Sequence, residues 1–275
     1  MDDICRDIKS KEKAVNLLFL TQGTLIANVG MSSIHTENNL QGQDKVSDYG
    51  AHTETSEGLH YAAALVVYSR NRFIVNLLPL LQNATALRRV VSVFTTTKEG
   101  PIDTTNFQGW RLPLMAQRGH ASSIVTLSLE ALAKKAPDVS FIHNFPGAVR
   151  SGIGRGTNGG IMSIVKAVYK LIGPLVYIPT IEAGERHVFL ATSARYPAGT
   201  NGDAASGVPL AGGVVISRGT NGKSGSGVYS VDWDGESAGP KVEELLADFR
   251  KEGMVEKVWK HTEDEFKRIT GVEAA

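Results

Sequence analysis

The chain has 275 residues, 42% hydrophobic and 21% charged, which is enough for one compact domain with a sizeable core. Its 29 Lys and Arg residues are interspersed with 28 Asp and Glu residues, so it has no basic block of the kind that a nucleic-acid partner requires. No apolar run approaches the roughly 20 residues that cross a bilayer, and an acidic start with a lone Cys5 favours a cytoplasmic protein without a membrane partner.

Three short apolar runs predict strands at 14–20, 89–94 and 139–143. They alternate poorly between apolar and polar residues, as strands buried on both faces of a parallel sheet do. Between them, the spacing of apolar residues predicts long helices at 59–81 and 120–135. Strands that alternate with helices over long crossovers predict an α/β fold with a doubly wound parallel sheet and helices on both faces.

The second half of the chain is less regular. Helices are predicted at 161–172 and 182–192, and residues 214–217 and 228–231 are predicted to form a hairpin or successive strands. We therefore expect a single domain, 1–275, with a core at about 1–195, an irregular hairpin region at about 196–239, and C-terminal helices, broken near Gly253, at about 240–271.

Three strings, 15–23, 89–97 and 141–151, each run from an apolar strand into a polar or Pro-Gly turn. In order and spacing they resemble three strands of the short-chain dehydrogenase/reductase family, which end in an Asn-Asn-Ala-Gly turn, the catalytic serine and a nicotinamide-contacting loop. The resemblance covers about residues 1–195 and is nearest to homologues from fungal secondary-metabolite clusters. It implies an incomplete Rossmann-like fold.

The same resemblance implies features that this chain lacks. Family members begin with a glycine-rich phosphate cradle, but only 13 residues precede the first predicted strand, so we expect an N-terminally truncated fold. The family's proton-donating tyrosine and its lysine align with Gly119 and Ser123, and its helical asparagine falls near Val66. Only the serine position keeps a hydroxyl, at Thr95 or Thr96. We therefore expect no NAD(P)H cofactor.

The carboxyl ends of the strands carry the candidate site, because ligands of doubly wound sheets bind there. His120 lies one position from the missing tyrosine, at the mouth of the former pocket, and is the candidate general acid or base. Thr95 and Thr96 are candidates to hold a substrate carbonyl. The candidate substrate-binding residues are Gln22, Tyr68, Phe145 and Arg150. No metal is expected, because no Cys or His cluster has the spacing of metal ligands.

A structural interpretation stands beside each chemical one. His120 is alternatively a solvated histidine at a helix start, and Tyr68 a packing or interface residue. His143 is interpreted as a hydrogen-bonded core histidine. Lys98 and Glu99 are interpreted as a solvated loop, with a catalytic role as the lesser alternative.

Three functions remain open. The first is a non-redox enzyme of cyclase, isomerase or dehydratase type acting on a small apolar metabolite, because holding a reactive conformer can lower a barrier by roughly 7–11 kcal/mol. The second is a catalytically inactive homologue that acts as a binding or assembly partner. The third is an NAD(P)H-dependent oxidoreductase of the family. Wide apolar faces on helices 59–81 and 120–135 predict a homodimer.

Overall fold

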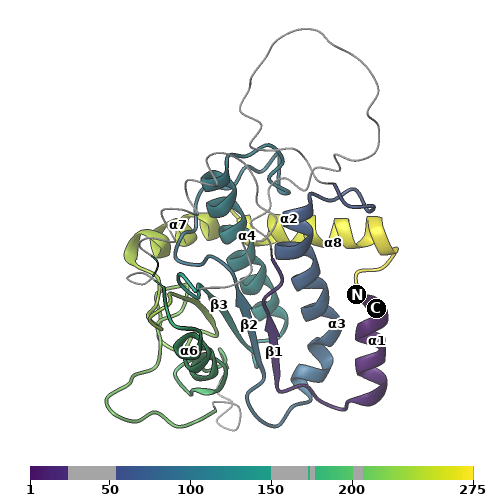
Figure 1. Ribbon diagram of the computed structural model, residues 1–275. Helices are drawn as coiled ribbons and strands as arrows, with labels where there is room; N and C mark the ends of the chain where they lie inside the picture. Colours follow the sequence, from purple (N-terminus) through teal and green to yellow (C-terminus); the bar gives the residue numbers. More distant parts are fainter. Residues whose placement is uncertain (24–53, 150–172, 174–176, 201–206, 275) are drawn as a thin grey trace, which may run out of the picture.

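The computed structural model describes residues 1–23, 54–149, 173, 177–200 and 207–274 (Figure 1). Its four-stranded sheet has the order β1-β2-β3-β4, and every neighbouring pair is parallel. The first three strands fall where the apolar runs predicted them, which confirms the parallel α/β sheet. The strands are β1 (Leu17–Leu20), β2 (Arg89–Val93), β3 (Ser140–Asn144) and β4 (Val228–Val231).

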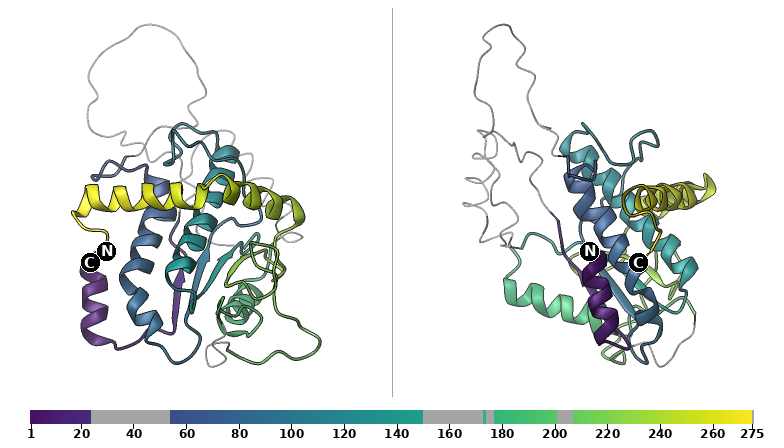
Figure 2. Two further views of the ribbon diagram at one scale, coloured as in Figure 1. Left: turned by 180° about the vertical axis from the view of Figure 1, so that it is seen from behind. Right: turned by 90° about the vertical axis from the view of Figure 1, so that its right-hand side faces the viewer.

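Helices cover both faces of the sheet (Figure 2). One continuous helical segment joins β1 to β2, and α4 (Leu114–Lys135) joins β2 to β3 on the same face. The opposite face carries α6 (Thr180–Thr192), whose Leu190 packs with Ile142 of β3. This arrangement confirms the doubly wound prediction. The segment between β1 and β2 consists of α2 (Tyr61–Ala63), the π-helical turn η1 (Ala64–Tyr68) and α3 (Ser69–Gln82).

The position of β4 corrects one expectation from the sequence. The predicted hairpin is wrong: β4 is fully buried and pairs in parallel with β3, whereas residues 214–217 form no strand. Val214, Val215 and Ile216 are 37%, 67% and 45% exposed, so the apolar side chains of this run are not buried against a sheet. A strand buried on both faces needs a neighbour whose faces are already covered by helices, and β3 provides it.

The C-terminal helices form a further layer on the outside of α4. They are α7 (Pro240–Lys251) and α8 (Met254–Thr270), and Gly253, with a φ of 69°, separates them, as predicted. The apolar face of α8 joins the main core through Val258 and Phe266.

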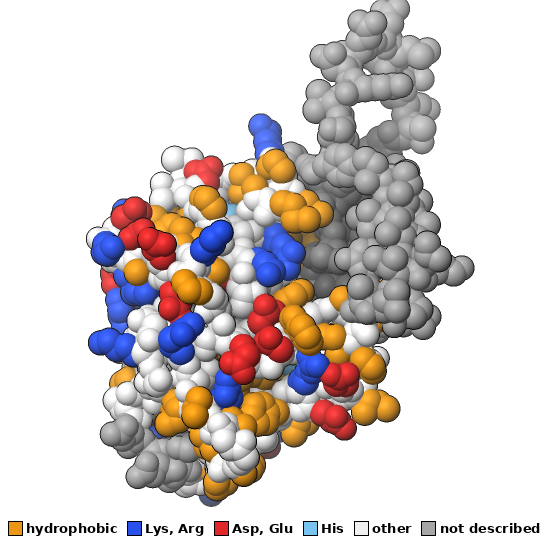
Figure 3. Space-filling model, turned by 90° about the vertical axis from the view of Figure 1, so that its left-hand side faces the viewer, with side chains coloured by type: hydrophobic (Ala, Val, Ile, Leu, Met, Phe, Trp, Pro, Cys, Tyr) orange, Lys and Arg blue, Asp and Glu red, His pale blue; other side chains and the backbone are white. Residues whose placement is uncertain are grey.

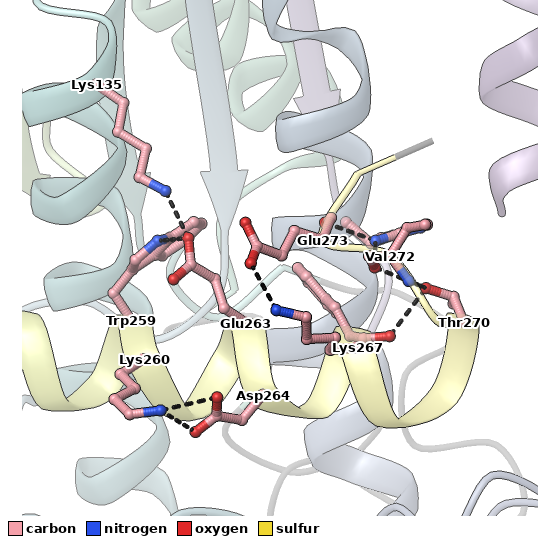
Figure 4. Close-up of polar contacts among 11 residues, drawn as sticks. Lys135, Trp259, Lys260, Glu263, Asp264, Lys267, Thr270, Val272 and Glu273 are labelled. Carbon is pink, nitrogen blue, oxygen red and sulfur yellow. Dashed lines mark hydrogen bonds and ion pairs between the residues drawn. The ribbon is translucent and has the colours of Figure 1, made fainter.

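Polar contacts fix α8 against α4 (Figure 4). Glu263 of α8 accepts hydrogen bonds from Lys135 Nζ of α4 at 2.6 Å and from Trp259 Nε1 at 2.5 Å, and Lys135 Nζ lies 4.5 Å from the centre of the Trp259 ring. The outer face of α4, which the sequence assigned to a partner subunit, is therefore covered by the chain itself. The homodimer stays a prediction and would need another surface.

The N-terminal helix α1 (Asp2–Lys11) packs against α3, with Cys5 buried beside Leu77 and Leu80. Asp2 and Arg72 form a bidentate ion pair at 2.6 and 2.7 Å. This pair anchors α1 to α3.

Other surface features contribute little to the predicted site at the strand ends. Within the described residues, no helix is long and apolar enough to cross a membrane. On the face shown in Figure 3, Lys and Arg side chains are intermixed with Asp and Glu side chains. The predicted helix at 161–172 lies outside the described residues.

Candidate functional site

Three predicted site residues lie where the strands end. Gln22 follows β1, Thr95 follows β2 and Phe145 follows β3, so all three are at the carboxyl edge of the parallel sheet. Gln22 Nε2 donates to Ser69 Oγ at 3.2 Å, and the Phe145 ring lies 5.3 Å from the guanidinium carbon of Arg118. Thr95 Oγ1 is buried, and no other described residue bonds it.

Just below this edge the sheet carries a buried polar row. Ser92 on β2, His143 on β3 and Ser230 on β4 are neighbours in register. Two residues nearer the start of each strand, Val90, Phe141 and Val228 belong to the main apolar core. Because side chains on a strand alternate between faces, the polar row points toward α3 and α4 as the apolar row does.

Glu99 enters this row from the loop after β2. Its Oε1 accepts hydrogen bonds from Thr96 Oγ1 at 3.1 Å, Ser230 Oγ at 3.0 Å and Thr126 Oγ1 at 2.9 Å. Thr126 Oγ1 also lies 2.8 Å from His143 Nδ1, and Thr96 bonds Ser230. We call these five residues the Glu99 cluster.

Burial displaces both ionisable groups of the Glu99 cluster toward their neutral forms. It raises the pKa of the Glu99 carboxyl, although the three hydroxyl hydrogen bonds act in the opposite direction. It also lowers the pKa of His143 well below 6.5, and the nearby charge of Arg70 acts in the same direction. Glu99 Oε2 and His143 Nε2 are buried, with no hydrogen-bond partner among the described residues.

Two positions on α4 hold the loop that carries Glu99. Gly100 N donates to Gly119 O at 3.1 Å, and a Cβ built on Gly119 would lie 3.1 Å from Gly100 Cα. Ser123 Oγ accepts from Gly100 N at 3.0 Å and donates to Gly100 O at 2.7 Å. Both contacts are with the loop backbone at Gly100, so they fix the position of the neighbouring Glu99 backbone.

On the other side of His143 lies a buried arginine. Arg70 of α3 donates to Ser92 Oγ at 2.8 Å and to the backbone oxygen of Gln22. Its guanidinium carbon lies 5.8 Å from the centre of the Phe94 ring, which stacks on His143. Burial lowers the pKa of Arg70 to about 10, so the group remains a cation at neutral pH.

His120 and Tyr68 lie away from the Glu99 cluster. His120 is in the second turn of α4 and only 2% exposed, so it is not the solvated histidine at a helix start that was the alternative interpretation. Its Nδ1 accepts from the Asp103 backbone N at 3.2 Å, and its Nε2 is 3.1 Å from Phe107 O. Tyr68 OH is 2.6 Å from His261 Nε2 of α8. Both side chains connect helices to neighbouring segments in this structure.

Comparisons with known proteins identify the family. No family model matches the chain. Oxidoreductase AN1596 of Emericella nidulans is 36% identical over 267 residues, which cover 96% of this chain and 72% of that protein. The NmrA-like family domain-containing oxidoreductase notO of an Aspergillus species is 30% identical over 97% of this chain and 68% of its own length. Short-chain dehydrogenase/reductase SAT2 of Stachybotrys chartarum is 28% identical over 76% of this chain and 58% of its own length. This chain belongs to the short-chain dehydrogenase/reductase family.

Similarity to solved structures is lower. The NADPH-bound carbonyl reductase from chicken fatty liver has a TM-score of 0.41 at 10% identity, over 86% of this chain and 69% of that chain. A protein from Mycobacterium paratuberculosis has a TM-score of 0.46 at 13% identity, over 97% and 72%. Neither value is high enough to add support.

Gly119 and Ser123, the positions predicted to match the tyrosine and lysine of the short-chain dehydrogenase/reductase family, contact the loop at Gly100. A side chain at 119 would meet the backbone of Lys98 and Gly100 within 3.1–3.3 Å, so a tyrosine does not fit unless the loop moves. Ser123 has both its bonds to Gly100. The described residues therefore do not fit the family's proton relay to a nicotinamide cofactor. No three His, Cys, Asp or Glu side chains gather as a metal ligand set in the described segments.

The structure brings together only some of the predicted site residues. Thr96 is in the Glu99 cluster, and Thr95 is beside it in sequence. Arg150 lies outside the described residues. His143 is confirmed as a hydrogen-bonded core histidine. The interpretation of Glu99 as part of a solvated loop is wrong, because the loop folds back onto α4 and leaves that side chain 9% exposed.

Proposed function

We propose that this chain is a non-redox enzyme of the short-chain dehydrogenase/reductase family, of isomerase, cyclase or dehydratase type, acting on a small apolar metabolite. One observation carries the proposal: Gly119 and Ser123, which the sequence predicts to stand at the family's tyrosine and lysine positions, contact the loop at Gly100 instead. The same contacts bring a carboxyl group, Glu99, into the buried polar row. Carboxyl groups transfer protons without a hydride carrier.

The residues at the strand ends suit such a reaction. Thr95 Oγ1 is buried without a described partner, so its hydroxyl could bond a ligand carbonyl once the ligand reaches it, while Phe145 offers an apolar surface at the same edge. Holding the substrate in a reactive conformer contributes to rate whatever group moves the proton. His120 as acid or base stays a prediction, and both its ring nitrogens are already engaged.

Calorimetric titration with NADH and with NADPH tests the proposal directly. We expect no binding at micromolar concentrations of either cofactor. The reason is that Gly119 and Ser123, at the positions predicted for the family's tyrosine and lysine, contact the loop at Gly100. Micromolar binding of NADPH, together with NADPH-dependent reduction of a carbonyl substrate, would overturn the proposal.

That outcome would favour the second candidate, an oxidoreductase. A specific observation supports this alternative: the relative that is 36% identical over 96% of this chain is named an oxidoreductase. A homodimer is also part of the proposal, through a surface other than the α4 face covered by α8. Sedimentation at micromolar concentration checks it, and a monomer would count against it.

A further inference from the structure

The carboxyl group of Glu99 is surrounded by hydroxyl groups and lacks an ionic partner. Its contacts are with Thr96, Thr126 and Ser230, and no Lys or Arg forms a salt bridge to it among the described residues. Glu130, another buried glutamate, differs: its Oε1 accepts from Arg250 Nη1 at 2.7 Å. A buried carboxylate without a cation is costly, so a group in this position tends to keep its proton.

A count of protons in the Glu99 cluster leads to the same result. Five contacts join its members: three to Glu99 Oε1, one between Thr96 and Ser230, and one between Thr126 and His143. Each contact needs one proton between its two heavy atoms. The three hydroxyls and His143 Nδ1 supply four, and a protonated Glu99 supplies the fifth, in which case it donates to Thr96 or Ser230 in one of the three contacts at Oε1.

The charged and titratable groups around the Glu99 cluster supply neither a proton nor a positive charge to the Glu99 carboxyl group. His143, from β3, reaches Thr126 rather than the carboxyl group. Arg70, from α3, directs its donors to Ser92 and to Gln22 O. Lys98 is exposed, and Asp232 after β4 adds a negative charge beside the loop, where it accepts from Thr97 Oγ1 at 3.2 Å.

The loop that places Glu99 holds an unfavourable backbone conformation. Thr97 has a φ of 64°, a left-handed value that a β-branched residue rarely adopts. Such strain persists only where surrounding contacts enforce it, and strained residues occur most often at functional sites. Here the enforcing contacts are those of Gly100 with Gly119 and Ser123.

We infer that Glu99 is held as a neutral carboxylic acid at neutral pH and is the proton donor of the candidate site at the strand ends. Its role as donor rests on the proposed function; its protonation does not. The substrate class is an unsaturated carbonyl compound with a removable proton on a carbon beside its C=C bond. The carboxyl O–H bond breaks as the π electrons of the substrate's C=C bond form a new C–H bond, and hydroxyls at Oε1 stabilise the resulting carboxylate. A C–H bond on the neighbouring carbon then breaks, its electron pair forms the shifted C=C bond, and its proton returns to Glu99, so the isomerisation balances.

Carbon-detected NMR of protein labelled with ¹³C at glutamate Cδ tests the protonation. The Glu99 resonance, identified by its loss in Glu99→Gln, is expected at the carboxylic-acid position at pH 7 and to move only at higher pH than the exposed glutamates. A carboxylate shift for Glu99 at pH 7 would overturn the inference. If Glu99→Gln does not fold, the Glu99 Cδ resonance of the wild-type protein can be assigned through its connectivity to the backbone, and its chemical shift gives the same information.

Glu130→Gln provides the matched control. It replaces a buried carboxylate that has an arginine partner, so it should lower Tm by several degrees, whereas Glu99→Gln, which replaces a neutral acid by a neutral amide, should change Tm little. Equal losses in both variants would contradict the inference. Micromolar NADPH binding with NADPH-dependent reduction of a carbonyl substrate would overturn the proposed function yet leave the Glu99 shift unchanged, so the two failures are distinguishable.

Discussion

Replacing Gly119 with alanine adds one methyl group at the point where α4 meets the loop that carries Glu99. The new Cβ would lie 3.1 Å from Gly100 Cα and 3.3 Å from both Gly100 N and Lys98 O. All three neighbours are backbone atoms, so none can swing aside as a flexible side-chain end could. The loop or the helix must shift.

Two opposing effects set the size of the change. Alanine in place of glycine inside a helix contributes about 1 kcal/mol to folding stability. Inserting a methyl group into a filled contact costs about 1–3 kcal/mol. We therefore expect Gly119→Ala to lower the free energy of unfolding by about 0–2 kcal/mol.

Gly184→Ala is the matched control. Gly184 lies in α6, and a Cβ there would meet nothing within 4 Å, so only the helical gain of about 1 kcal/mol remains. Urea unfolding of the two variants followed by circular dichroism measures the difference, which should be about 1–3 kcal/mol in favour of Gly184→Ala. If both variants gain stability equally, the close packing of Gly100 on Gly119 is refuted.

Three further predictions concern other parts of the molecule. Tyr68→Phe removes the 2.6 Å bond to His261 and leaves a partly buried ring nitrogen unpaired, so we expect the free energy of unfolding in urea to fall by about 1–2 kcal/mol. Burial lowers the pKa of His143 and His261 below 6.5, so the unfolded chain binds the protons first, and the stability that these residues confer is full above pH 6.5 and falls as the pH drops. Because the raised pKa of Glu99 acts in the opposite direction, the test uses Glu99→Gln, in which a urea midpoint that is flat from pH 8 to 5 would contradict this. Trp259→Ala should cost about 3–5 kcal/mol and increase amide exchange in α8, whereas unchanged exchange would show that α8 is held by other contacts.

The sequence predicted those features that local pattern determines. The strand at 89–93 is rich in valine, and the helices around it have apolar residues at helical spacing, so both were found without knowledge of their neighbours. The parallel pairing of β4 was missed, because four buried residues on a strand do not reveal their partner. The π-helical turn η1 was also missed, since its residues are ordinary helix formers.

The candidate site was harder to predict for a related reason. Glu99 follows Lys98 in a stretch that resembles a solvated loop, and its burial depends on contacts with Gly119 and Ser123, about 20 residues further along the chain. Relative to the family, these two positions are predicted to have lost their functional side chains. A better signal was their small size together with Gly100, which permits the loop and the helix to approach closely.

The helix α8 affects how the chain folds as it is made. Lys135 of α4 and Glu263 of α8 form an ion pair across 128 residues of sequence. At a synthesis rate of about 5–20 residues per second, the outer apolar face of α4 waits roughly 6–26 s for the segment that covers it. During that interval the nascent chain exposes a surface that the finished protein buries. Chaperone dependence in the cell, rather than final stability, is therefore the property most sensitive to the length of chain between these two helices.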